Sequence, residues 1–156
     1  MGRKYTISFS DIACSAVQDA VSIKAGASVV FRVLEARLSQ NTSTTSAQVR
    51  VRLSRLTATA TLGSGGDATP DIAKHETGDA AIVSTAHTND TTQATTSGAK
   101  STIFEDTFNT LSGWLFVPVP EQLLVFSPGE GFALEFPAAP ASADYSGSVT
   151  IEELGG

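Results

Sequence analysis

Apolar and polar residues alternate along much of the chain, which is the pattern of strands that face a core on one side and solvent on the other. Residues 47–56 show it most clearly, with three apolar residues on one face and two arginines on the other. The inward residues are Val49, Val51 and Leu53, and the outward ones are Arg50 and Arg52. Residues 4–9 repeat the pattern, and residues 28–40 predict a long strand with a buried middle.

The alternation changes phase after the middle of this clearest strand. The later apolar residues of the stretch have even numbers, whereas the earlier ones have odd numbers. A β-bulge produces such a one-residue change of phase. We therefore expect a bulge near Ser54 and Arg55, with the strand continuing through Leu62.

The second half of the chain carries further strand patterns. They lie at residues 101–108, 113–119, 122–126, 130–136 and 147–154. Residues 127–130, Ser-Pro-Gly-Glu, predict a tight turn between two of these strands. Residues 11–21 are the one helix candidate, with Asp11 as its N-cap, but their serine and β-branched content favours a short turn or strand.

Two stretches lack periodicity. Residues 63–71 are rich in glycine and predict a loop. Residues 84–101 contain almost no large apolar side chain and predict a long exposed loop or arm.

These elements predict an all-β protein of about eight or nine strands, either a β-sandwich or a barrel, and among these folds a jelly-roll-like β-sandwich is favoured. Long early strands, short and closely spaced late strands, and loops that cross between sheets favour the jelly roll. The chain has 156 residues, which predicts a single domain over residues 1–156.

The charges are few and unevenly distributed. The formal net charge of −6 argues against nucleic acid as a partner, because phosphate binding needs clustered lysine and arginine. Residues 1–56 hold eight basic and three acidic residues, a balance of +5, whereas residues 57–156 hold two and thirteen, a balance of −11. Either the two halves pair within one domain, or a basic patch on one subunit meets an acidic patch on another.

Residues suited to catalysis or metal binding are sparse. His75 and His87 lie in polar, loop-like surroundings, and Cys14 has no histidine beside it in the sequence. "KHETGD" offers His75, Glu76 and Asp79 as metal ligands, but a solvated loop is the favoured interpretation. We therefore expect no enzyme, catalytic residue, metal or cofactor, and we expect Cys14 to be a small buried thiol.

Two further sequence patterns argue against a catalytic site. "GSGGD" at residues 63–67 lacks the Lys-Ser/Thr and the helix of a phosphate-binding loop. The adjacent carboxylate pairs at 105–106 and 152–153 are expected to point to opposite faces of their strands. No apolar run approaches the roughly 18 residues of a membrane helix, so no membrane partner is expected.

The stretch "GWLFVPV" at residues 113–119 is apolar on both faces and interrupted by prolines. Pro118 and Pro120 lack backbone donors, so the segment is expected to be an edge strand or a strand end. An apolar edge needs a cover, either from the chain's own loops or from a neighbouring subunit. The candidate residues for an interface with a subunit or capsid are Trp114, Leu115, Phe116, Val117, Arg50 and Arg52.

Three stretches of the chain resemble capsid decoration, or cement, proteins of tailed bacteriophages. They are "MGRKYTISFSD" at the start, "SGWLFVPVPEQLLVFSPGEGFALEFPAAPA" in the second half and "SGSVTIEELGG" at the end. The similarity covers both termini and residues 112–156 and leaves residues 57–100 unmatched. It implies a jelly-roll-like homotrimer on the capsid exterior of the virion, with the major capsid protein as its partner.

Two functions follow as expectations. The first is a structural virion protein that binds the outside of an assembled head and bridges capsid subunits, gaining avidity from several contacts. The alternative is a receptor- or glycan-binding module of a phage tail or fibre. Exposed aromatic residues in the long loops would favour that alternative, and these loops contain none.

Overall fold

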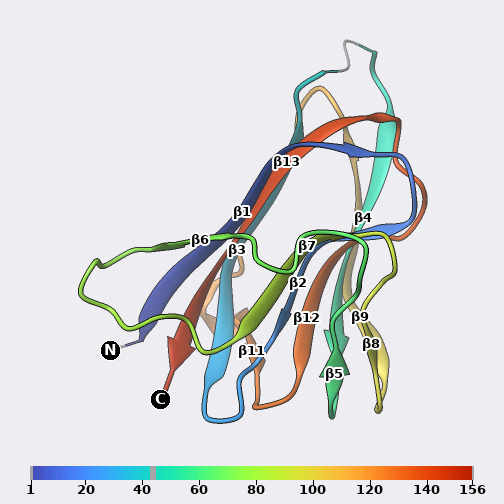
Figure 1. Ribbon diagram of the computed structural model, residues 1–156. Helices are drawn as coiled ribbons and strands as arrows, with labels where there is room; N and C mark the ends of the chain where they lie inside the picture. Colours follow the sequence, from blue (N-terminus) through green and yellow to red (C-terminus); the bar gives the residue numbers. More distant parts are fainter. Residues whose placement is uncertain (1, 43–44, 156) are drawn as a thin grey trace.

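The computed structural model describes residues 2–42 and 45–155 and shows an all-β sandwich (Figure 1). The strands are β1 (Arg3–Cys14), β2 (Gln18–Lys24), β3 (Val30–Gln40), β4 (Gln48–Leu56), β5 (Ala60–Thr61), β6 (Asp71–Lys74), β7 (Thr85–Asp90), β8 (Thr95–Thr96), β9 (Lys100–Asn109), β10 (Trp114–Phe116), β11 (Leu124–Phe126), β12 (Gly131–Phe136) and β13 (Ala143–Leu154). One 3-10 turn, η1 (Pro120–Gln122), separates β10 from β11. Within the described ranges, no helix is long and apolar enough to cross a membrane.

Two antiparallel sheets form the two layers. The first sheet has the order β10-β3-β13-β1-β6, with β11 also paired to β3. The second sheet has the order β7-β2-β12-β4-β9. A short pair, β5 with β8, lies outside both sheets. This strand order is compatible with the jelly-roll-like prediction.

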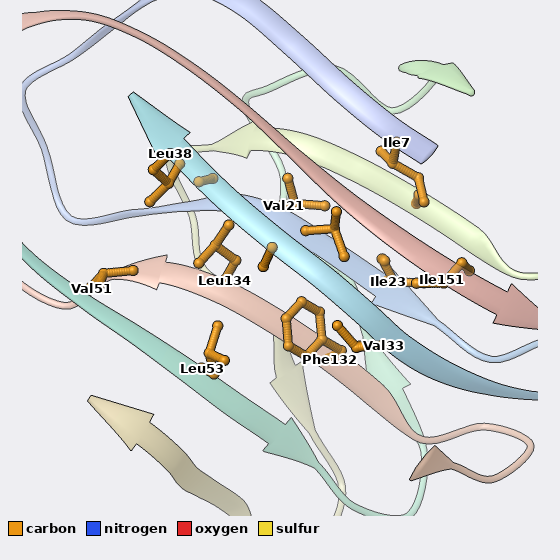
Figure 2. Close-up of a cluster of buried hydrophobic side chains, with 14 of the residues drawn as sticks. Ile7, Val21, Ile23, Val33, Leu38, Val51, Leu53, Phe132, Leu134 and Ile151 are labelled. Atoms are coloured by element: carbon orange, nitrogen blue, oxygen red, sulfur yellow. The ribbon is translucent and has the colours of Figure 1, made fainter. Parts of the chain in front are cut away.

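Alternating side chains from both sheets fill the space between the layers (Figure 2). The first sheet supplies residues such as Ile7, Val33 and Ile151, and the second supplies Val51 and Phe132. All five are 0% exposed. The predicted inward faces of residues 4–9 and 47–56 are therefore largely confirmed, because a strand places every second side chain on the same side.

The bulge predicted near Ser54 and Arg55 occurs at that place in the pairing of β4 with β9, but its extra residue lies on β9 and not on β4. Strand β4 pairs with β12 without a register shift, and the extra residue lies on the other neighbour, at Ile103 of β9. The strand ends at Leu56 and does not continue through Leu62. Leu56 is buried on the outer face of the sheet, against Ala60 and Ala94. The change to even-numbered apolar residues therefore reflects a second apolar cluster, separate from the core between the sheets.

Strand β3 contains a β-bulge that changes which side chains face the core, and its sequence does not reveal this change. Val33 and Ala36 are both buried, and the pairing with β13 shifts between these positions. One extra residue therefore lies between them on β3, and the two ends of the strand face the core with opposite parity.

The prediction of a long exposed loop over residues 84–101 is wrong. This stretch contains β7, which pairs with β2, then β8 and the first residues of β9. Ala86, Thr88 and Asp90 are buried. The sequence pattern contains no strand signal here because the buried side chains of β7 are small or polar.

The stretch at residues 11–21 forms no helix. It is the end of β1, a short bend and the start of β2, as the serine and β-branched content favoured. The turn at 127–130 is confirmed, with Glu130 N donating to Ser127 O and Gly129 at a φ of 84°.

Candidate functional site

An edge strand broken by prolines borders the first sheet. Strands β10 and β11 both pair with β3, at opposite ends of it, and η1 connects them. Pro118 lies in the connection after β10, and Pro120 is the first residue of η1. The predicted edge position of residues 113–119 is therefore confirmed.

The two faces of β10 have different environments. Trp114 is 8% exposed and stacks on the half-buried Phe116, with ring centroids 6.2 Å apart. Trp114 Nε1 also donates to Asp106 Oδ2 at 3.3 Å. Trp114 and Phe116 thus belong to the core of this chain.

The other face of β10 is open to solvent. Leu115 is 60% exposed, and Val117, the residue after β10, is 58% exposed. Two more residues of the same border, Val119 and Val125, are 52% and 43% exposed. We call Leu115, Val117, Val119 and Val125 the apolar edge.

The apolar edge is the strongest candidate for an interaction surface. Single exposed apolar residues are ordinary, but several along one border are typical of a contact surface. Leu115 also lies in a shallow groove on the outer face of the first sheet, together with Arg37, Ser8 and Ser148. The sequence indicated Leu115 and Val117, whereas Val119 and Val125 were missed; the continued alternation past Pro118 was the available signal for Val119.

Arg50 and Arg52 lie on the outer face of the second sheet, not beside the apolar residues of β10. Arg50 pairs with Glu105 of β9. Arg52 donates from Nε to Glu135 Oε2 of β12 at 2.7 Å. The carboxylates that face these two arginines are therefore supplied within the chain.

Ion pairs connect the basic first half of the chain to its acidic second half. Besides Arg50 and Arg52, the pairs include Arg3 with Glu153, Arg32 with Glu152, and Arg55 with Glu130. The intrachain interpretation of the charge asymmetry is therefore confirmed, because the topology places the two halves on neighbouring strands.

The histidines lie in separate places. His75 Nε2 lies 2.9 Å from Thr6 Oγ1 on the exposed surface. His87 Nδ1 lies 3.1 Å from Asp90 Oδ2 on the second sheet. Among residues 2–42 and 45–155, no group of three or more histidine, cysteine or carboxylate side chains is arranged to hold a metal ion.

Cys14 is a buried thiol, as expected. It is 1% exposed and accepts a hydrogen bond from Gln18 Nε2 at 3.2 Å. Burial raises the pKa of the Cys14 thiol to about 11, so the thiol stays protonated at neutral pH.

The glycine-rich stretch at 63–67 passes over β7. Gly66 N donates to Asp90 Oδ1 at 3.1 Å, and a Cβ at Gly66 would lie 2.2 Å from Thr88 O. Glycine is needed here because the two backbones approach too closely for a side chain. The predicted loop is confirmed, and its glycines serve packing against β7.

The carboxylate pair at 152–153 divides between two faces, as predicted. Glu152 pairs with Arg32 on the outer side. Glu153 is 1% exposed and accepts hydrogen bonds from Val83 N and Ser84 N. Both carboxylates therefore have structural partners.

No protein-family model, curated protein or solved structure matches this chain.

Proposed function

We propose that this chain is a structural virion protein that decorates the outside of a bacteriophage head, with copies of itself and the major capsid protein as partners. The apolar edge carries the proposal, because it leaves four aliphatic side chains without a cover among the described residues. The edge lies within residues 112–156, the region that resembles decoration proteins. In this proposal the protein acts through binding, and no reaction is assigned to it.

The apolar edge is proposed as the contact between copies in a homotrimer. Full burial of a valine or leucine side chain contributes roughly 1.5–3 kcal/mol relative to exposure. These side chains start half-exposed, so each contributes less than that range. The gain must exceed the entropic cost of association, which is several kcal/mol. The contact that closes the ring is effectively intramolecular, which favours a closed trimer.

The arginines contribute unequally to this proposal. Arg52 is engaged by a fully buried carboxylate, Glu135, and is only 26% exposed. Arg50 is 55% exposed, and its partner Glu105 lies on an edge strand. A charged contact to the capsid therefore rests on Arg50 rather than on Arg52.

A charge placed on the apolar edge tests the trimer. The wild-type protein is expected to have a mass near three chains by light scattering, and Val117→Lys is expected to give a folded monomer. Val17→Lys is the matched control, because Val17 is also exposed, at 43%, but lies in the bend between β1 and β2. A wild-type monomer at micromolar concentration contradicts the trimer.

Heads that lack the protein test the location. Added wild-type protein and Val17→Lys are expected to saturate such heads in many copies, whereas Val117→Lys binds weakly because it loses avidity. Binding to tails in few copies would contradict decoration and support the receptor- or glycan-binding alternative.

A further inference from the structure

Three carboxylates form a row on the outer face of the second sheet. Asp19 of β2 is in register with Asp90 of β7 on one side and with Glu135 of β12 on the other. Directly opposed residues of antiparallel strands point to the same face, with Cβ atoms about 4.5–5.5 Å apart. All three residues are 0–1% exposed. Asp19 thus lies between two other buried carboxyl groups.

A separate part of the chain lies over Asp19 and Asp90 of this row. Residues 57–67 and 91–99, which we call the cover, contain β5 and β8 and are joined by hydrogen bonds such as Ser97 N to Thr59 O. Ala94 N of the cover donates to Asp19 Oδ2 at 2.7 Å. Asp19 is therefore one of the groups that hold the cover on the sheet.

The carboxylates on either side of Asp19, Glu135 and Asp90, each have strong polar partners. Glu135 accepts hydrogen bonds from Arg52 and Ser54 and forms an ion pair with Lys100 at the start of β9. Asp90 accepts from Gly66 N and lies beside the His87 ring. Glu135 and Asp90 therefore each have more polar partners than Asp19 has.

Asp19 is the least compensated of the three. Its Oδ2 accepts one backbone hydrogen bond, and its Oδ1 has no hydrogen-bond partner. The cations Arg52 and Lys100 are engaged by Glu135. A buried carboxylate with one donor and two negative neighbours favours its protonated form.

We propose that Asp19 carries a proton near neutral pH and that this proton makes the seating of the cover on the second sheet depend on pH. Closing the cover removes Asp19 from water beside Glu135 and Asp90. Opening the cover returns Asp19 to water, where it ionises at the lower pH of an ordinary aspartate. The closed form therefore holds a proton that the open form releases.

The direction of the effect follows from the pKa. Burial, and then the charges of Glu135 and Asp90, raise the pKa of Asp19 from 3.8 to about 7, against the opposing effects of Ala94 N and Lys100. Between these two values the closed form binds more protons than the open form. The cover is therefore most firmly closed below pH 4, loosens as pH rises to 7, and changes no further above it.

A titration of the side-chain carboxyl carbons by NMR tests the proton directly in the wild-type protein. The Asp19 carboxyl signal is expected to titrate with a midpoint near pH 7. A midpoint near pH 4 would overturn the proposal. The exposed Asp71 of β6 serves as an internal reference in the same spectra.

Amide hydrogen exchange tests the link to the cover. The protection factor of the Ala94 amide is expected to fall by up to about tenfold per pH unit between pH 5 and 7. Asp19→Asn, which mimics the neutral carboxyl, should remove this dependence, and Asp71→Asn should retain it. A wild-type protection factor that does not change with pH would overturn the proposal, whether or not the Asp19 variant folds.

Discussion

The apolar edge and the covered row of carboxylates reverse the usual places of apolar and charged residues. Leu115 and Val117 face solvent, whereas Asp19 and Glu135 are sealed from it. The cause is the same in both regions, because burial depends on whether another part of the chain passes over the surface. Beside β10 no further strand of the described chain continues the sheet, whereas the outer face of β2 and β12 lies beneath the cover.

The largest expected contrast lies within the edge strand itself. Trp114→Ala is expected to lower the free energy of unfolding by about 3 kcal/mol, because it removes a buried ring and its stacking on Phe116. Leu115→Ala, one residue away, is expected to change the stability of the isolated subunit by less than about 0.5 kcal/mol. Urea unfolding of the two variants under monomeric conditions measures the difference. Similar losses would show that the outward face of β10 is also packed.

A second contrast compares a buried ion pair with an exposed one. Glu135→Ala leaves Arg52 and Lys100 without their shared carboxylate, so a loss of about 2–3 kcal/mol is expected. The matched variant Glu105→Ala removes only the exposed partner of Arg50, with an expected loss below about 1 kcal/mol. Urea midpoints that move equally would mean that Glu135 is not secluded from water.

A third contrast concerns how closely the cover packs. A Cβ at Gly131 would lie 2.8 Å from Ala60 Cβ and 3.0 Å from Leu56 Cδ1. Gly131→Ala is therefore expected to push β5 from the sheet and cost about 1–2 kcal/mol. Gly78→Ala is the control, because nothing lies within 4 Å of a Cβ at that position. Equal thermal midpoints for the two variants would show a loosely seated cover.

The edge strand shows what a sequence pattern could predict about this protein and what it could not. Two prolines after β10 predicted its edge position from local chemistry alone, because proline cannot donate in a sheet. The same pattern did not separate core from interface, since both faces of residues 114–117 are apolar. Only the placement of β10 beside β3 assigned Trp114 inward and Leu115 outward.

The missed strand β7 shows the opposite case. Its sequence, Thr-Ala-His-Thr-Asn-Asp, has no large apolar residue, and its burial comes from β2 beside it and the loop with Gly66 above it. Both contacts join residues far apart in the sequence. A pattern read within a short window of the sequence therefore cannot predict these contacts.

The sequence by itself determined the strand class and the inward side of each clearly alternating strand, because a strand has a side-chain period of two and only one side faces the core. It also predicted a sandwich or barrel of strands, because short alternating strands separated by turns bury their apolar faces only against one another. The tertiary structure alone decided the environment of the outward residues. Asp19 became buried and Val117 stayed exposed because that environment depends on which distant segment covers each surface, and residues near them in the sequence do not set it.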